Sequence, residues 1–227
     1  MSTMGHGGWA LLASGFSRRF GADKLLAPLP GRHLTVLEQT LSAYRKTRYP
    51  LAVVLRPDQQ QHVQYLPEDV AVLANADAAQ GMAASIRCAV RWAQAEELEW
   101  LGIALADMPW IQPDTLQVLA GHAHRERIAR PVYVGPDRTG LASSQGISTA
   151  RQGLAGHPVL FGQRFFPELA RLIGDEGARR LLASLPQDQL DRVPTADCGC
   201  FQDVDTPADL TGPPGAAAVL SVRAKRR

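Results

Sequence analysis

Short apolar runs alternate with longer amphipathic segments along most of the chain. The apolar runs predict buried strands at 9–13, 51–55, 70–74, 100–106 and 131–135. Apolar positions at helical spacing predict helices at 35–47, 60–66, 81–94, 112–126, 165–174 and 175–185. This alternation predicts an α/β fold, in which helices cover both faces of a mostly parallel sheet.

Two stretches interrupt this alternation. Residues 135–156 are rich in Gly and Ser and predict a mobile loop. Residues 211–227 open with turn residues and end in a basic cluster, which predicts a disordered basic tail. We therefore expect one domain over residues 1–210, followed by that tail.

The bulk composition narrows the class of protein. The formal charge of +2 over 227 residues argues against a nucleic-acid binder, and only the short terminal run "RAKRR" points the other way. No apolar run approaches 18 residues and no signal peptide is evident, so no membrane association is expected. The odd count of 3 cysteines gives no disulfide framework. A cytoplasmic protein is therefore predicted.

The stretch "LLASGFSRRFGADKLL" places glycines and positive charge directly after a predicted strand. Gly15 and Gly21 allow the backbone to curl so that its N–H groups point at an anion, and Arg19 and Lys24 add charge. The dinucleotide fingerprint and the P-loop both fail on spacing, because five residues separate the glycines and Lys24 follows Gly21 by three. A different phosphate-binding loop is predicted; the alternative is a solvated basic turn.

Acidic residues follow two further segments. Asp107 ends the most apolar predicted strand and is a candidate ligand of magnesium (Mg2+). The alternative is that it caps the following helix. In "CFQDVDTPADL", Asp203 and Asp205 alternate on an extended chain, so one of them is expected to face the cleft as a second ligand. The alternative is a helix N-cap at Asp205 or Thr206.

The segment "NADAAQGMAASIR" predicts a helix that opens at Gly81 and carries Ser85 and Arg87 in its first turns. Its free N–H groups are candidates for binding an anion, although a glycine before a helix is also common without one. Cys198 and Cys200 have no companion Cys or His pair, so we expect no zinc site. Plain buried thiols are the simpler interpretation of the pair.

Several of these motifs together resemble the MobA-like nucleotidyltransferase family. They are "LLASGFSRRFGADKLL", "GMAASIR", "LADMPWI", "GHPVLF" and "DVDTPADL", in the order expected, and the resemblance spans Trp9 to Leu210. It implies a three-layer α/β/α sandwich with a Rossmann-like, mostly parallel mixed sheet of about seven strands. "GMAASIR", "GHPVLF" and "GDEGARRLL" are most similar to molybdenum cofactor cytidylyltransferases. Ser14 departs from the glycine of the guanylyltransferase branch and from the alanine of the cytidylyl branch.

The resemblance implies transfer of CMP from CTP to the molybdopterin cofactor with release of pyrophosphate, and a molybdenum hydroxylase as a client. A GTP-using enzyme, a transferase for another phosphate acceptor and a non-catalytic cofactor carrier are the alternatives. The implied roles are catalytic for Lys24, Arg19 and Asp107; nucleotide-binding for Leu12, Ala13, Ser14, Gly15, Lys24, Gly81 and Ser85; acceptor-binding for Arg87 and His157; and metal-binding for Asp107, Asp203 and Asp205.

Overall fold

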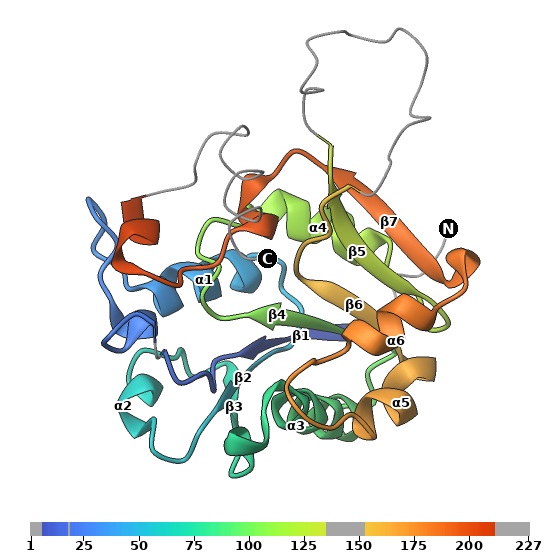
Figure 1. Cartoon of the computed structure of the whole chain (residues 1–227), viewed down its shortest axis with the longest axis horizontal. Coiled ribbons are helices and arrows are strands. Elements are labelled where there is room, and N and C mark those ends of the chain that lie inside the picture. The colour runs from blue at the N-terminus through green and yellow to red at the C-terminus, as the bar shows by residue number, and fades with distance from the viewer. Residues whose placement is uncertain (1–5, 18, 135–152, 212–227) are drawn as a thin grey trace, which may run out of the picture.

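Seven strands form one sheet in the computed structural model of the chain, which describes residues 6–17, 19–134 and 153–211 (Figure 1). The sheet order is β3-β2-β1-β4-β6-β5-β7. All neighbours pair in parallel except β6, which is antiparallel to both β4 and β5. The strands are β1 (Gly7–Leu12), β2 (Leu51–Leu55), β3 (Val70–Ala74), β4 (Trp100–Leu105), β5 (Ile128–Tyr133), β6 (Val159–Gly162) and β7 (Leu190–Thr195).

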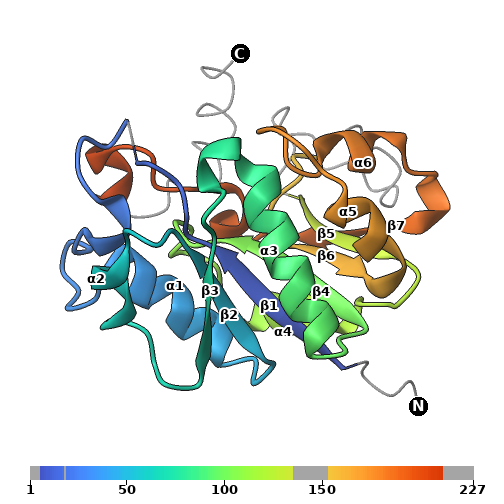
Figure 2. The same ribbon diagram turned by 90° about the horizontal axis from the view of Figure 1, so that it is seen from below.

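Helices cover both faces of this sheet, which confirms the predicted three-layer α/β/α arrangement (Figures 1 and 2). One face carries α1 (Val36–Arg45) and α4 (Pro113–Gly121). The opposite face carries α3 (Met82–Ala95), α5 (Phe166–Ala170) and α6 (Arg179–Ser184). The short helix α2 (Gln60–Val63) follows β2.

The central strand β1 is apolar throughout because each of its faces packs against a separate core. Trp9 and Leu11 point into the core under α1 and α4, whereas Ala10 points into the core under α3. Trp9 also makes edge-on contacts with Tyr44 and Trp100, at centroid distances of 5.4 and 5.1 Å. A strand buried on both faces has no polar alternation, so it appears in the sequence as a continuous apolar run.

Most predicted elements are confirmed, and β2 and β3 have the bounds predicted. Strand β7 was not predicted from its sequence, because only Leu190 and Val193 are buried and Pro194 interrupts the pattern. Proline is tolerated there because β7 is an edge strand. The helix predicted at 175–185 begins only at Arg179, after a turn in which Gly177 has a φ of 58°. The tail from residue 212 and most of the predicted loop, residues 135–152, lie outside the described residues.

The order of the strands creates a crevice between β1 and β4. The chain moves outward from β1 to β2 and β3, and then returns to place β4 on the other side of β1. The two strands end in register, with Leu12 beside Leu105. Ligands of open α/β sheets bind outside the carboxyl ends of the strands at such a reversal of the strand order.

Within the part of the chain that is described, no helix combines the length and the apolar character needed to cross a bilayer.

Candidate functional site

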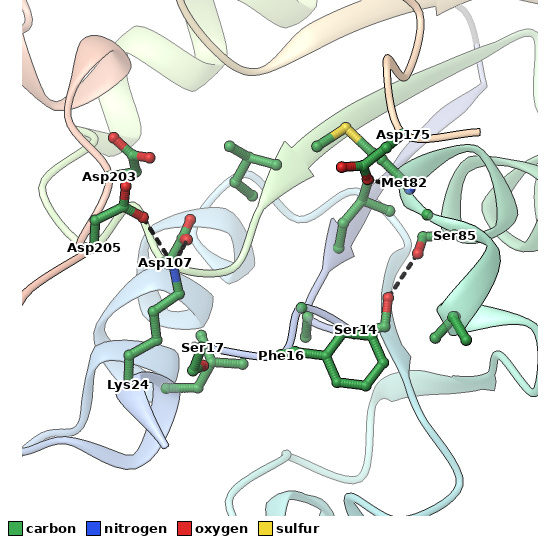
Figure 3. A pocket seen from close by; sticks show the side chains of 18 of the residues that line it. Ser14, Phe16, Ser17, Lys24, Met82, Ser85, Asp107, Asp175, Asp203 and Asp205 are labelled. Atoms are coloured by element: carbon green, nitrogen blue, oxygen red, sulfur yellow. Dashed lines mark hydrogen bonds and ion pairs between the residues drawn. The ribbon is translucent and has the colours of Figure 1, made fainter. Parts of the chain in front are cut away.

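A cavity of about 710 Å³ lies at the carboxyl ends of β1 and β4 (Figure 3). In Figure 3, Asp107, Asp203, Asp205 and Lys24 occupy one side, and Met82, Ser85 and Asp175 occupy the other. All the residues predicted to bind nucleotide, to bind metal or to act in catalysis line it. These residues are Leu12, Ala13, Ser14, Gly15, Arg19, Lys24, Gly81, Ser85, Asp107, Asp203 and Asp205.

Three carboxylates meet on one wall of the cavity. Asp107, Asp203 and Asp205 each offer an oxygen, and these oxygens all lie within 4.8 Å of one another. The backbone N–H of Val204 donates to the carbonyl oxygen of Asp107 at 2.9 Å, which fixes the C-terminal segment beside the end of β4. The expectation that only one of Asp203 and Asp205 faces the cleft is wrong. Residues 202–205 are not a regular strand, so the side-chain alternation of a strand does not apply.

The alternative capping roles of these acids are not what the structure shows. Helix α4 has Gln112 as its N-cap, and the N–H of Gln112 donates to Asp197 at 2.8 Å, not to Asp107. The N–H groups of Asp205 and Thr206 both donate to Asp209, at 3.1 and 2.7 Å. Asp107 and Asp205 both line the cavity.

Lys24 is the cation at the centre of the carboxylate cluster. Its Nζ lies 2.5 Å from Asp107 Oδ2 and 3.3 Å from Asp205 Oδ1, and its side chain is only 14% exposed. Burial lowers the pKa of Lys24, but Asp107 and then Asp205 outweigh that effect, so the pKa is raised and the ammonium stays charged. Arg19 reaches the same cluster through Asp205 at 3.1 Å, with a side chain that is 78% exposed.

The cluster has the chemistry of a divalent-cation site. Burial raises the pKa of Asp107, Lys24 opposes this effect, and the negative charges of Asp203 and Asp205 raise the pKa further. Asp107 Oδ1 is buried and has no hydrogen-bond partner among the described residues. Clustered carboxylate oxygens with a buried oxygen lacking a partner suit a hard cation such as Mg²⁺.

The loop after β1 forms the floor of the cavity. The N–H of Ala13 donates to Val54 at 3.0 Å and continues the sheet, so it is not available to a ligand. A Cβ added at Gly15 would meet nothing within 4 Å, so packing within the described protein does not demand a glycine there. The absent side chain instead leaves room for a ligand to approach the backbone of Gly15.

Ser14 does not point a free hydroxyl into the cavity. Its Oγ lies 2.6 Å from Ser85 Oγ, and Asn75 Nδ2 donates to the same Ser85 oxygen at 3.1 Å. All three side chains are buried. Ser14, where the sequence departs from both branches, therefore joins the end of β1 to α3.

The N-terminus of α3 differs from the expectation of free N–H groups. Met82 N–H donates to Asp175 Oδ1 at 3.1 Å, and Ala83 N–H donates to the carbonyl of Gly174 at 3.1 Å. Gly81 has a φ of 96°, and a Cβ there would lie 2.7 Å from the carbonyl oxygen of Gly174. Gly81 is thus needed for the close approach of the 174–175 segment, which supplies the caps of α3.

Arg87 and His157 are not among the residues that line the cavity. Arg87 donates to the carbonyl of Leu172 at 2.6 Å and to Gln80 Oε1 at 2.9 Å, which joins α3 to the segment after α5. The backbone N–H of His157 donates to the carbonyl of Cys200 at 2.8 Å. Their assignment to the acceptor stays a prediction.

Cys198 and Cys200 also lie outside the cavity lining. Cys200 is fully buried, and that burial, reinforced by Asp197, raises the pKa of its thiol well above the ordinary range. Burial and Asp197 raise the pKa of the half-buried Cys198 as well. Both side chains are free thiols in this structure and are poor nucleophiles near neutral pH.

Sequence reasoning missed several residues at or near the cavity. Phe16, Ser17, Met82 and Asp175 line it, and Arg56 holds the floor loop from outside. Arg56 directly follows β2, so the rule that ligands gather at the carboxyl ends of parallel strands pointed to it. Asp175 carried no such signal, because its place at α3 depends on a contact between distant segments.

The fold agrees with comparisons with known proteins. A family model described as a MobA-like NTP transferase domain matches residues 9–192. The chain belongs to the MobA-like NTP transferase family. The family resemblance derived from the motifs is therefore confirmed, and nucleotidyl transfer is the chemistry of the family.

Three relatives illustrate the range of this family and fold. The purine catabolism protein PucB of Bacillus subtilis (strain 168) is 28% identical over 207 residues, which cover 87% of this chain and 91% of PucB. The homologue of Mycobacterium tuberculosis Rv0371c from Mycobacterium sp. strain JC1 has a TM-score of 0.72, 25% identity and coverage of 96% and 98% of the two chains. Rv0371c of M. tuberculosis H37Rv in complex with manganese has the same fold, with a TM-score of 0.66, 24% identity and coverage of 91% and 96%.

Proposed function

We propose that this nucleotidyltransferase transfers CMP from CTP to the molybdopterin cofactor and releases pyrophosphate. The observation that carries the nucleotidyl transfer is the meeting of Lys24 with three carboxylates in one cavity at the β1–β4 crevice. The choice of CTP and of the cofactor rests on the similarity of "GMAASIR", "GHPVLF" and "GDEGARRLL" to cytidylyltransferase motifs. A molybdenum hydroxylase is the proposed recipient of the product.

The proposed reaction needs no protein nucleophile. An oxygen of the terminal phosphate of the acceptor attacks the α-phosphorus of CTP, and the bond from that phosphorus to the bridging oxygen of the β-phosphate breaks. The electron pair of the broken bond leaves with pyrophosphate. Catalysis then consists of positioning the two reactants in line and stabilising charge on the phosphate oxygens.

The side chains of the cavity are suited to that task. The loop Ala13–Gly15 holds the nucleotide, and the ammonium of Lys24 and the guanidinium of Arg19 offset negative charge on the triphosphate and on the leaving pyrophosphate. Asp107, Asp203 and Asp205 would hold Mg²⁺, which supplies Lewis-acid stabilisation of the phosphate oxygens when bound.

Pyrophosphate release tests this proposal. Purified protein is incubated with Mg²⁺, molybdopterin cofactor and one of CTP, GTP, UTP or ATP, and the dinucleotide product is identified by mass. We expect release with CTP above the other three. Release with GTP alone would assign the guanylyl reaction instead, and no release with any nucleotide when the cofactor is supplied would favour a cofactor carrier.

Substitution of Asp107→Asn should lower the rate of pyrophosphate release by about 100-fold or more, because the metal loses its buried carboxylate. The matched control is Asp69→Asn, which removes an acid paired with Arg45 on the exposed surface. Near-normal Mg²⁺-dependent activity in Asp107→Asn would overturn the metal assignment.

A further inference from the structure

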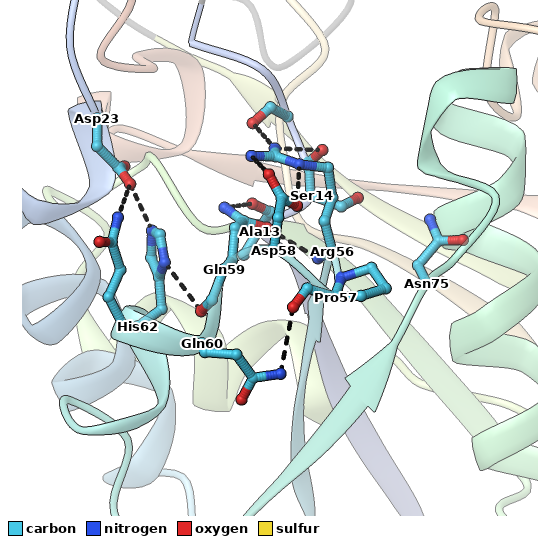
Figure 4. A network of polar contacts seen from close by, with 12 residues as sticks. Ala13, Ser14, Asp23, Arg56, Pro57, Asp58, Gln59, Gln60, His62 and Asn75 are labelled. Carbon is cyan, nitrogen blue, oxygen red and sulfur yellow. Dashed lines mark hydrogen bonds and ion pairs between the residues drawn. The ribbon is translucent and has the colours of Figure 1, made fainter.

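A short segment outside the cavity contacts the loop that follows β1 at two places (Figure 4). The first is the start of the loop, at residues 13–15, and the second is Asp23, at the turn that carries Lys24. This segment, Arg56–His62, follows β2 and includes the start of α2, and we call it the bracket. Within the described structure, none of its residues lines the cavity. Its polar contacts with the loop come from four side chains, those of Arg56, Gln59, Gln61 and His62.

At the start of the loop, side chains of the bracket donate hydrogen bonds to three consecutive backbone carbonyl groups. Gln59 Nε2 donates to the carbonyl oxygen of Ala13 at 3.1 Å. Arg56 Nη1 donates to the carbonyls of Ser14 at 3.1 Å and of Gly15 at 2.6 Å. A planar trans peptide points its N–H opposite to its carbonyl, so carbonyls held toward the bracket turn the following N–H groups away from it. Those N–H groups belong to Ser14, Gly15 and Phe16, which line the cavity.

The guanidinium of Arg56 is itself held on its other sides. Its Nε and Nη2 donate to the two carboxylate oxygens of Asp58 at 2.9 and 3.3 Å, and the group lies 4.6 Å over the ring of Phe16. Gln59 Oε1 accepts the backbone N–H of Arg56 at 2.8 Å. Arginine can serve these partners at once because its donors form a planar fork, whereas a lysine ammonium is a single point charge.

At the second place, the bracket reaches the turn that carries Lys24. His62 is fully buried, with Nδ1 3.2 Å from the carbonyl oxygen of Gln59 and Nε2 2.9 Å from Asp23 Oδ2. The other oxygen of Asp23 accepts the N–H of Leu25 at 3.2 Å and so caps the short 3₁₀ turn Lys24–Leu26. His62 therefore connects the first end of the loop to the base of Lys24.

We propose that Arg56 and His62 are positioning residues for nucleotidyl transfer, which act on different ends of one loop. Arg56 aims the backbone N–H groups that receive the nucleotide. His62, through Asp23, sets the turn from which Lys24 reaches the phosphates. This inference rests on the nucleotide site proposed above.

The positioning roles of Arg56 and His62 should affect different kinetic parameters of pyrophosphate release, measured at steady state with Mg²⁺ and the preferred nucleotide. Backbone N–H groups hold the nucleotide in the ground state and the transition state alike, so Arg56→Lys should raise KM about ten-fold and leave kcat within about two-fold. Lys24 acts on charge that develops during transfer, so His62→Leu should lower kcat about ten-fold at little change in KM. His62→Gln, which offers a side-chain amide N–H to Asp23, should recover part of that kcat.

Arg45→Lys is the matched control, because Arg45 forms a comparable arginine–carboxylate pair with Asp69 on the exposed surface, and neither residue lines the cavity. It should leave KM and kcat unchanged. If Arg56→Lys fails to fold, Asp58→Asn is the second variant. It removes the carboxylate that holds the Arg56 guanidinium, the side chain of Asp58 is 71% exposed, and the substitution should also raise KM. A purely structural bracket would lower the melting temperature of the variants without separating KM from kcat, and that result would overturn the proposal.

Thermal shift of the wild-type protein with Mg²⁺ and CTP, GTP, UTP or ATP distinguishes the two ways of failing. No stabilisation by any of these nucleotides would overturn the proposed function and this inference together. Stabilisation of the wild type and an equal stabilisation of Arg56→Lys would leave the proposed function standing and overturn the bracket alone.

Discussion

At the residue scale, Ser14 changes meaning once its neighbours are known. In the sequence it is a departure from two related motifs, within the loop that is expected to bind the nucleotide. In the structure its hydroxyl lies 2.6 Å from Ser85 and is buried, and Asn75 completes the network. A buried polar group costs free energy unless it is hydrogen-bonded, so each of the three depends on the others.

Ser14→Ala should therefore lower the free energy of unfolding by about 1 kcal/mol, which corresponds to about 2–4 °C in melting temperature for a chain of this size. The same substitution at Ser85 and the double variant complete a mutant cycle, measured by chemical denaturation. We expect a coupling of about 1 kcal/mol between the two positions. Additive effects would show that the two hydroxyls do not interact.

At the element scale, α3 is held at its N-terminus by a segment 93 residues away in the chain, as measured from Met82 to Asp175. The contact requires Gly81, whose φ of 96° and proximity to the carbonyl of Gly174 exclude a side chain. Helix caps of this kind are worth about 0.5–2 kcal/mol. The position of α3, and of Ser85 on its first turns, thus depends on the loop between α5 and α6.

Gly81→Ala should lower the free energy of unfolding by about 2 kcal/mol or more, because it combines a left-handed φ with a steric overlap. Gly121→Ala is the matched control. Gly121 is the last residue of α4 and a Cβ there meets nothing within 4 Å, so alanine should be neutral or slightly stabilising. Urea denaturation of both variants measures the difference, and an equal loss at both positions would contradict the explanation.

At the scale of the whole molecule, the carboxylate cluster exists only when the chain is folded. Asp107 lies at the end of β4, and Asp203 and Asp205 lie near the end of the described chain. The unfolded chain does not hold these groups together, so a cation that binds the cluster binds the folded state alone and stabilises it. Without the cation, burial raises the pKa of Asp107, Lys24 opposes this effect, and the charges of Asp203 and Asp205 raise that pKa further.

Mg²⁺ at about 100 times its dissociation constant should therefore stabilise the protein by about 2.7 kcal/mol, seen as a rise in melting temperature. Asp203→Asn should lose most of that rise. Without metal, its melting temperature should equal or exceed that of the wild type, because the substitution relieves repulsion on Asp107. Asp69→Asn should respond to Mg²⁺ as the wild type does, and a full response by Asp203→Asn would remove Asp203 from the metal site.

The sequence determined the class of fold, the five strands β1 to β5 and most of the polar residues that line the cavity. It did so because buried strands are continuous apolar runs and because the motifs that end β1 and β4 are local in the chain. It did not indicate β7, whose edge position permits charge and proline. Its assignment of Arg87 and His157 to the acceptor stays a prediction, because neither residue lines the cavity.

Only the tertiary structure decided which polar groups meet. The pairing of Lys24 with Asp107 and Asp205, the approach of both Asp203 and Asp205, and the grip of Arg56 and His62 on the loop all join segments that are distant in sequence. Hydrophobic periodicity reports which face of an element is buried, but it carries no information about the partner of a polar side chain. That partner is set by the strand order, which brings the ends of β1, β2 and β4 to one edge of the sheet.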